Sequence, residues 1–240
     1  MTSHAPRNAR TSDPLALPAL TLVPLPTVVP QGALVRVTTP LATPLLTGLF
    51  GAQALLALQV IAGLAPGGTE AVGGATALRA ADVPVGEGAG WILAPFVRAP
   101  GAGNRSRFSD GTYGVWYGAD SLATAQAEVG FHLGQWLATT QAAPDHLERS
   151  VVEALADPAR PVVDLRTADP ARSTLLNPSD YTAGQAFGAA CRRADFWGVL
   201  WPSVRGAGLC AGLFRPRALR EARLLHTCHA VWDGQRVTWT

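Results

Sequence analysis

The sequence contains no lysine, because all 19 of its basic residues are arginine. Any cationic site must therefore be built from guanidinium groups, which bind carboxylates and phosphates in a bidentate manner. Charged residues make up only 15% of the chain, and the formal net charge of +2 does not indicate a nucleic-acid surface. Hydrophobic residues make up 48% of the 240 positions, which excludes global disorder and predicts a packed core.

Cysteine is also scarce, with Cys191, Cys210 and Cys228 the three in the chain. An odd and sparse set indicates a reducing compartment, so we expect a cytoplasmic protein without disulfides. His226, Cys228 and His229 form a local cluster, but neighbours in a strand point to opposite faces. No second pair of ligands has a zinc-like spacing, and we therefore expect no metal.

The first 90 residues divide into two parts. Residues 1–33 are rich in proline, which disfavours helix and interrupts the apolar region of any signal peptide, so an extended arm is expected. Residues 34–90 are expected to form a helical region packed on the core. Within them, Leu45–Ala65 carries no charge and is long enough to span a bilayer. Its glycines and glutamines, and the absence of flanking basic clusters, favour a buried helix over a membrane span.

Residues 91–240 are expected to form the main domain. Predicted helices cover 122–139, with Ser121 as the cap, and 178–194, with Asn177 as the cap. The predicted strands are 91–97, 106–108, 113–117, 150–155, 161–165, 198–201, 211–214, 223–231 and 236–240. Strands outnumber helices and mostly follow one another through turns. This order predicts an α+β domain with a mixed β-sheet core and flanking helices.

Side chains that could bind a ligand or take part in catalysis are concentrated just before and inside the first predicted helix. Arg107, Tyr113 and Tyr117 surround a glycine turn, and Glu128 follows about two turns into the helix. Taken singly, each has an ordinary structural explanation, such as an ion pair, a strand aromatic or a surface glutamate. Together they indicate a cleft, because strand ends and helix starts often line binding sites.

Two blocks of the sequence, taken in their order along the chain, resemble one protein family. The run 106–119, followed by 124–128, resembles the first half of the RES-domain family, and 198–205 resembles its Pro-Ser-Val-Arg block. Residues 164–166 and 177–181 resemble the region between the blocks, and the likeness spans roughly 91–232. The resemblance implies an ADP-ribosyltransferase-like fold, activity on NAD+, and a toxin whose active site is covered by a small Xre-like antitoxin. In this chain Trp201 stands where the family commonly has Tyr, and Cys210 where many members have Asn.

The resemblance also implies roles that suit the residue types. Arg107, and second Arg205, would bind the pyrophosphate of NAD+. Tyr117 or Tyr113 would stack on the flat, cationic nicotinamide ring. NAD+ would be the substrate, with no metal required.

Two further roles concern the bond that breaks. Glu128 would stabilise the positive charge that develops on the ribose. Ser203 would hydrogen-bond a phosphate or the amide without acting as a nucleophile, because no His–Asp pair is evident beside it. The function expected first is depletion of NAD+ by hydrolysis or phosphorolysis, and the sequence does not separate it from ADP-ribosyl transfer to a protein acceptor. A third alternative is an inactive binding module of the same fold, which the intact set of Arg107, Tyr117, Glu128 and Ser203 disfavours.

Overall fold

The structure is a computed structural model. It describes residues 25–41, 78, 80–84, 86–97, 101–167 and 170–240. The segment Leu45–Ala65 and most of the proline-rich arm lie outside the described residues, so the expectations for them stay predictions. Among the described residues, no helix combines the length and the apolar character that crossing a membrane requires.

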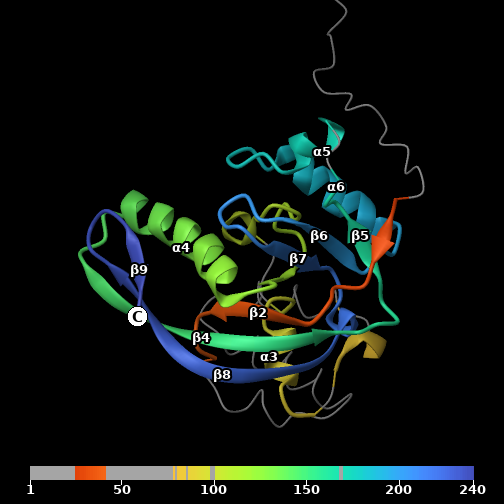
Figure 1. Ribbon diagram of the computed structural model, residues 1–240, viewed down its shortest axis with the longest axis horizontal. Coiled ribbons are helices and arrows are strands. Elements are labelled where there is room, and N and C mark those ends of the chain that lie inside the picture. Colours follow the sequence, from red (N-terminus) through yellow and green to blue (C-terminus); the bar gives the residue numbers. More distant parts are fainter. Residues whose placement is uncertain (1–24, 42–77, 79, 85, 98–100, 168–169) are drawn as a thin grey trace, which may run out of the picture.

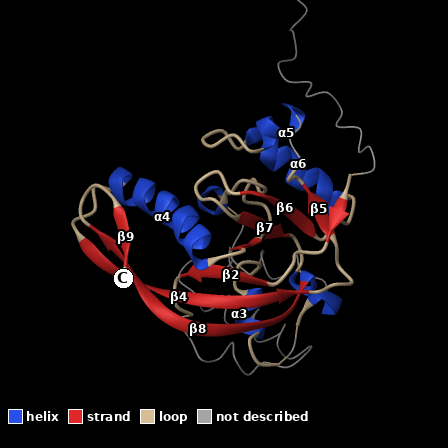
Figure 2. Ribbon diagram, viewed as in Figure 1, coloured by secondary structure: helices blue, strands red, loops and turns tan. Residues whose placement is uncertain are grey.

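A nine-stranded mixed sheet forms the centre of the described part (Figures 1 and 2), in the order β1-β5-β6-β7-β3-β2-β4-β8-β9. The strands are β1 (Thr27–Val28), β2 (Ala33–Thr38), β3 (Trp116–Ala119), β4 (Asp145–Ala156), β5 (Val162–Asp164), β6 (Gly198–Pro202), β7 (Leu209–Leu213), β8 (Leu219–Trp232) and β9 (Val237–Trp239). Strands β5 and β6 pair in parallel, and every other pairing is antiparallel. The predicted α+β class with a mixed sheet is confirmed.

The α-helices of the described part are α3 (Ala89–Leu93), α4 (Leu122–Thr139), α5 (Pro170–Leu175) and α6 (Thr182–Arg193). Short 3-10 turns cover 80–82, 102–104 and 216–218. Helices α4 and α6 pack with one buried cluster of the sheet, and α3 with the other. Val151 and Val152, which are neighbours on β4, belong to different clusters and are both fully buried. Since successive side chains of a strand point to opposite faces, the sheet is covered on both sides here.

Strand β2 lies between β3 and β4 in the sheet. It pairs with β4 over its whole length but with β3 at a single position, Val35 opposite Ala119. The sheet therefore opens between β2 and β3. The residues that form β1 and β2 were expected in the arm and the helical region, yet both strands belong to the same sheet as 116–239.

Helix α4 has the predicted bounds, and Ser121 caps it by accepting a hydrogen bond from the Thr124 backbone N–H at 3.3 Å. Helix α6 begins at Thr182, four residues later than predicted. The reason is that the Asn177 side-chain oxygen accepts hydrogen bonds from the backbone N–H groups of Ser179 and Asp180, which makes a turn.

The strand predicted over 91–97 is wrong, because α3 and a turn occupy this run. Ile92 and Phe96 are four residues apart and both buried, which is a helical spacing. Short apolar runs fit a buried strand and a buried helix equally well. The strand predicted over 106–108 is reduced to one bridge between Ser106 and Ser109, and that over 113–117 begins only at Trp116.

Candidate active site

A cleft of about 500 Å³ lies where β2 and β3 separate beneath α4. Its lining comes from the turn before β3, from strands β2, β3, β4, β6 and β7, from α4, and from the loop before α6. The polar and aromatic lining residues that matter below are Arg105, Ser106, Arg107, Tyr117, Glu128, His132, Arg149, Tyr181, Trp201 and Cys210. Pockets that bind small molecules typically have this size.

Glu128 lies on the second turn of α4 and contacts the hairpin of β6 and β7. The Ser203 hydroxyl donates a hydrogen bond to Glu128 Oε1 at 2.6 Å. The Cys210 thiol donates to the same oxygen at 3.7 Å. Burial raises the pKa of Cys210, so the thiol keeps the proton that it donates. Both donors meet one carboxylate oxygen, and Oε2 accepts no hydrogen bond from the described residues.

Ser203 is held by the loop that joins β6 to β7. Its hydroxyl oxygen accepts hydrogen bonds from the backbone N–H groups of Arg205 and Gly206, at 3.0 and 2.9 Å. The Ser203 N–H donates to the Gly208 carbonyl at 2.9 Å, which closes the loop. With both lone pairs of the hydroxyl engaged, its proton is directed at Glu128. This geometry suits a positioning role and not a nucleophile.

Arg107 is buried in the turn that precedes β3. Its Nη1 donates to the Asn177 carbonyl at 2.7 Å and to the Leu175 carbonyl at 3.5 Å, and its guanidinium lies 4.6 Å from the centre of the Tyr181 ring. Burial lowers the pKa of Arg107, while the charges of Tyr181 and Glu128 raise it. Arg107 therefore ties the loop between α5 and α6 to the cleft.

Arg205 contacts the same loop from the other side. Its guanidinium donates to the Pro178 carbonyl and lies 3.4 Å from the centre of the Phe131 ring. Both arginines that were expected to bind phosphate thus have backbone carbonyls as partners. The phosphate-binding role of Arg107 and Arg205 stays a prediction.

The two tyrosines of the 106–119 block lie in different environments. The Tyr117 ring lines the cleft, edge-on to Trp201 with 6.1 Å between ring centres. Its hydroxyl accepts a hydrogen bond from Phe108 N at 3.1 Å and lies 2.8 Å from Ser106 Oγ. Burial raises the pKa of Tyr117 to about 12, so the phenol stays neutral.

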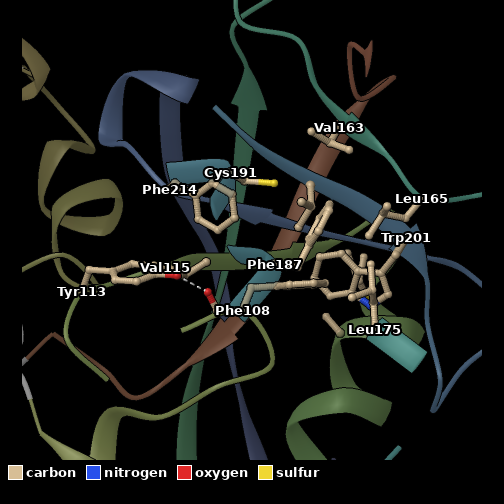
Figure 3. Packing of buried hydrophobic residues seen from close by; sticks show 14 of the residues in the cluster. Phe108, Tyr113, Val115, Val163, Leu165, Leu175, Phe187, Cys191, Trp201 and Phe214 are labelled. Atoms are coloured by element: carbon tan, nitrogen blue, oxygen red, sulfur yellow. Dashed lines mark hydrogen bonds between the residues drawn. The ribbon is translucent and has the colours of Figure 1, made fainter. Parts of the chain in front are cut away.

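Tyr113 belongs to the core instead. It is 9% exposed, and its hydroxyl donates to the Phe108 carbonyl at 2.5 Å (Figure 3). Its ring packs edge-on against Phe214, and it is not among the residues that line the cleft with Glu128. The structure therefore brings together Arg107, Tyr117, Glu128 and Ser203, but not Tyr113.

His132, Tyr181 and Arg149 are among the cleft residues that were not predicted. His132 follows Glu128 by one helical turn, and the spacing of four on an expected helix could have identified it. The Tyr181 hydroxyl lies 3.4 Å from His132 Nε2, which joins the loop before α6 to α4. Desolvation lowers the pKa of His132, which favours a neutral ring. Arg149 lines the cleft from β4, and no pattern in the sequence distinguished it from a surface arginine.

A search of curated proteins gives no significant match. Among solved structures, the M. tuberculosis MbcT–MbcA toxin–antitoxin complex is similar, with 23% identity, a TM-score of 0.35, and coverage of 50% of this chain and 71% of the other. The family model of the RES domain matches residues 78–233, which include every candidate site residue. The chain therefore belongs to the RES-domain family.

Proposed function

We propose that this chain is the toxin of a toxin–antitoxin pair and that it cleaves the nicotinamide–ribose bond of NAD+. The observation that carries the proposal is the Glu128 carboxylate, which has one oxygen fixed by Ser203 and Cys210 and the other without a hydrogen-bond partner among the described residues. It lines a cleft large enough for a dinucleotide end. Membership of the RES-domain family supports the same function.

The chemistry follows from the position of this carboxylate. As the bond from the ribose carbon to the nicotinamide nitrogen lengthens, positive charge develops on the ribose, and Glu128 stabilises it. The leaving nicotinamide keeps the bonding electron pair, which neutralises its ring. Water then forms the new C–O bond and releases a proton to the solvent. Ser203 acts through Glu128 by holding one carboxylate oxygen in place.

The aromatic side of the cleft fits the leaving group. Tyr117 is neutral and is held by Phe108 N and Ser106, so its ring is a fixed surface for the nicotinamide. A protein acceptor in place of water would give an ADP-ribosyltransferase, and phosphate would give phosphorolysis. All three reactions break the same bond and use the same Glu128.

The test is nicotinamide release from NAD+ by the purified full chain, with and without phosphate, together with identification of the ADP-ribose product. We expect turnover by the wild type and a loss of about a hundredfold or more in Glu128→Gln, which keeps the shape but loses the charge. Equal turnover by Glu128→Gln would overturn the assignment. A labelled protein band from tagged NAD+ in a lysate would identify the transferase instead.

The partner proposed for the cleft is a small antitoxin of the Xre type in the cytoplasm. Expression of the chain in bacteria is expected to stop growth and to lower cellular NAD+. Expression of the antitoxin from the same locus is expected to restore both. Growth arrest with unchanged NAD+ would contradict depletion as the cause of toxicity.

A further inference from the structure

Arg149 lines the cleft from β4, at the end away from Glu128. The pairing of Thr38 with Ser150 ends the ladder between β2 and β4, so the next residues, Thr39 and Arg149, lie side by side beyond it. Thr38 and Thr39 also line the cleft. Because side chains alternate along a strand, Thr39 is on the same face as Arg149 and Val151, whereas Thr38 is on the face of Ser150. This end of the cleft therefore combines one guanidinium with the hydroxyl group of Thr39.

The charge of Arg149 has little compensation from the protein. Its Nη1 donates to the Glu148 carbonyl at 2.7 Å. Burial lowers the pKa of Arg149, and the one group that raises it is the thiol of Cys228, its partner in the ladder. By contrast, Arg223 on β8 donates to the Glu153 carboxylate at 2.9 Å. In the part of the chain that the structure describes, Arg149 has no carboxylate partner. A half-buried cation in this state is unfavourable, and an anionic ligand relieves that cost.

Other arginines near the cleft are bound to the protein backbone. Arg107 and Arg205 donate to carbonyls of the loop between α5 and α6. Arg36 donates to the Tyr117 carbonyl at 2.9 Å, across the gap between β2 and β3. These bonds hold the walls of the cleft together. Arg149 donates instead to the carbonyl of its own sequence neighbour Glu148 and does not join two segments, so its guanidinium is a better candidate for contact with a charged ligand.

The distance between Glu128 and Arg149 suits a dinucleotide. Cys210 on β7 contacts Glu128, and β7, β3, β2 and β4 are successive strands of the sheet. Three strand spacings give roughly 14 Å across the sheet, and the four residues from Glu153, which pairs with Val35, to Arg149 add about 13 Å along β4. The backbones of Cys210 and Arg149 are therefore roughly 19 Å apart, and the long side chain of Arg149 can shorten this span. The phosphates of NAD+ extend away from the ribose that carries nicotinamide, and an extended dinucleotide reaches that far.

We propose that Arg149, with Thr39, forms a phosphate-binding subsite for the dinucleotide substrate. The inference rests on the proposed cleavage of NAD+ and assigns the phosphate to a residue outside the blocks 106–128 and 198–205. The phosphate is either the pyrophosphate, which NAD+ and NADP+ share, or the 2′-phosphate, which only NADP+ carries. A guanidinium binds either one in a bidentate manner.

The experiment measures kcat and KM for NAD+ and for NADP+ by nicotinamide release. It compares the wild type with Arg149→Gln and Arg149→Lys, and with Arg220→Gln, which removes an exposed arginine of β8, as the matched control. Arg149→Gln is expected to raise KM by at least about tenfold, the loss typical of a charge-assisted hydrogen bond, with kcat within about twofold. Arg149→Lys is expected to have an intermediate KM, because lysine keeps the positive charge but lacks the planar guanidinium that binds phosphate in a bidentate manner.

The pattern across substrates identifies the phosphate. An equal rise of KM for both dinucleotides assigns Arg149 to the pyrophosphate, and a rise confined to NADP+ assigns it to the 2′-phosphate. Unchanged KM for both, in a Gln variant that melts like the wild type, overturns the proposal. So does a fall in kcat alone.

Binding of ADP-ribose, followed by calorimetry, tests the subsite without turnover. If the wild type releases no nicotinamide, the proposed function fails, while weaker ADP-ribose binding by Arg149→Gln still supports the subsite. Equal binding by the wild type and both Arg149 variants overturns the subsite even if NAD+ is cleaved. Absence of ADP-ribose binding to the wild type overturns it as well.

Discussion

The Ser203 hydroxyl lies 2.6 Å from Glu128 Oε1 and donates its proton to it, across 75 residues of sequence. Two backbone N–H groups of the loop after β6 fix the hydroxyl oxygen, so the direction of the donor is set by the loop. One oxygen of the carboxylate is thereby oriented before any ligand arrives. Preorganised groups of this kind stabilise charge in a transition state without reorganising during the reaction.

Ser203→Ala removes this donor without adding bulk. We expect kcat for nicotinamide release to fall by about a hundredfold, the loss that removal of one preorganised donor commonly causes, with a small change in KM. Ser203→Thr keeps the hydroxyl and is expected to restore most of the activity. A rise of KM with unchanged kcat in Ser203→Ala would instead place the hydroxyl on the substrate.

Cys210 supplies a second and weaker donor to the same carboxylate oxygen, at 3.7 Å. Because burial keeps the thiol protonated, Cys210→Ala is expected to lower kcat, by about threefold to tenfold, which is less than the Ser203 variant. Cys210→Ser offers a stronger donor and is expected to match or exceed the wild type. If Ala and Ser variants lose activity equally, the thiol acts through packing and not through Glu128.

Cys191 predicts how stability depends on alkaline pH. The residue is fully buried, and burial raises the pKa of its thiol from 9.0 to about 12. Between these values the unfolded chain has lost the thiol proton and the folded chain retains it, so rising pH favours unfolding.

The expected measurement is the free energy of unfolding from denaturant titrations between pH 9 and 12. The wild type is expected to lose about 1.4 kcal/mol per pH unit more than Cys191→Ala, because the variant lacks this proton. Tyr113 and Tyr117 are present in both proteins, so their contributions to the pH dependence of the unfolding free energy cancel in the comparison. Parallel curves for the two proteins would show that Cys191 ionises in the folded state as easily as in the unfolded one.

Gly188 allows α6 to contact the backbone of the site. A Cβ at this position would lie 2.1 Å from the Phe108 carbonyl oxygen, which is far inside contact distance. Gly188→Ala is therefore expected to cost about 2–3 kcal/mol in the free energy of unfolding, measured by denaturant titration. The matched control is Gly134→Ala on α4, where a Cβ would meet atoms only at 3.7 Å or beyond.

The control is expected to be neutral or stabilising by up to about 1 kcal/mol, since alanine favours helix more than glycine does. A similar loss of unfolding free energy in both variants would mean that the close contact with Phe108 is not what makes alanine unfavourable at position 188. A neutral Gly188→Ala would mean that α6 moves away from Phe108 at little cost.

Features set by local chemistry were predictable from the sequence, and those set by long-range packing were not. The cap at Ser121 and the length of α4 depend on neighbouring residues, and both are confirmed. The short apolar run 91–97 has no local feature that separates strand from helix, and its contact with β8 decided the outcome. The opening of the sheet after the single pair of Val35 and Ala119 depends on strand register, which the sequence does not reveal.

The features of the site also divide into those that the sequence predicted and those that depend on long-range packing. Arg107, Tyr117, Glu128 and Ser203 were expected together because they stand in two recognisable blocks, and the structure places them around one cleft. The partners of Arg107 are carbonyl groups about 70 residues away, and backbone carbonyls leave no mark in a sequence. Residue type therefore indicated a cation in the site but not what it binds.

Arg107→Lys separates the two roles that this arginine can have. The guanidinium serves two carbonyls and the face of Tyr181, and the point charge of a lysine ammonium cannot match this planar arrangement. If Arg107 holds the loop, the amides of residues 176–181 are expected to exchange hydrogen faster in the variant, with kcat/KM for NAD+ lower by about tenfold or more. The matched control is Arg192→Lys, which removes a guanidinium lying over Tyr113 in the core.

The control is expected to leave the exchange of this loop and kcat/KM unchanged, because Arg192 contacts no cleft residue among the described ones. Lower kcat/KM in Arg107→Lys with unchanged exchange would place the guanidinium on the substrate. Faster exchange at 176–181 with lower kcat/KM would make Arg107 a positioning residue for Tyr181. In that case Arg107 acts on the protein's own loop, and the phosphate is left to other arginines of the cleft.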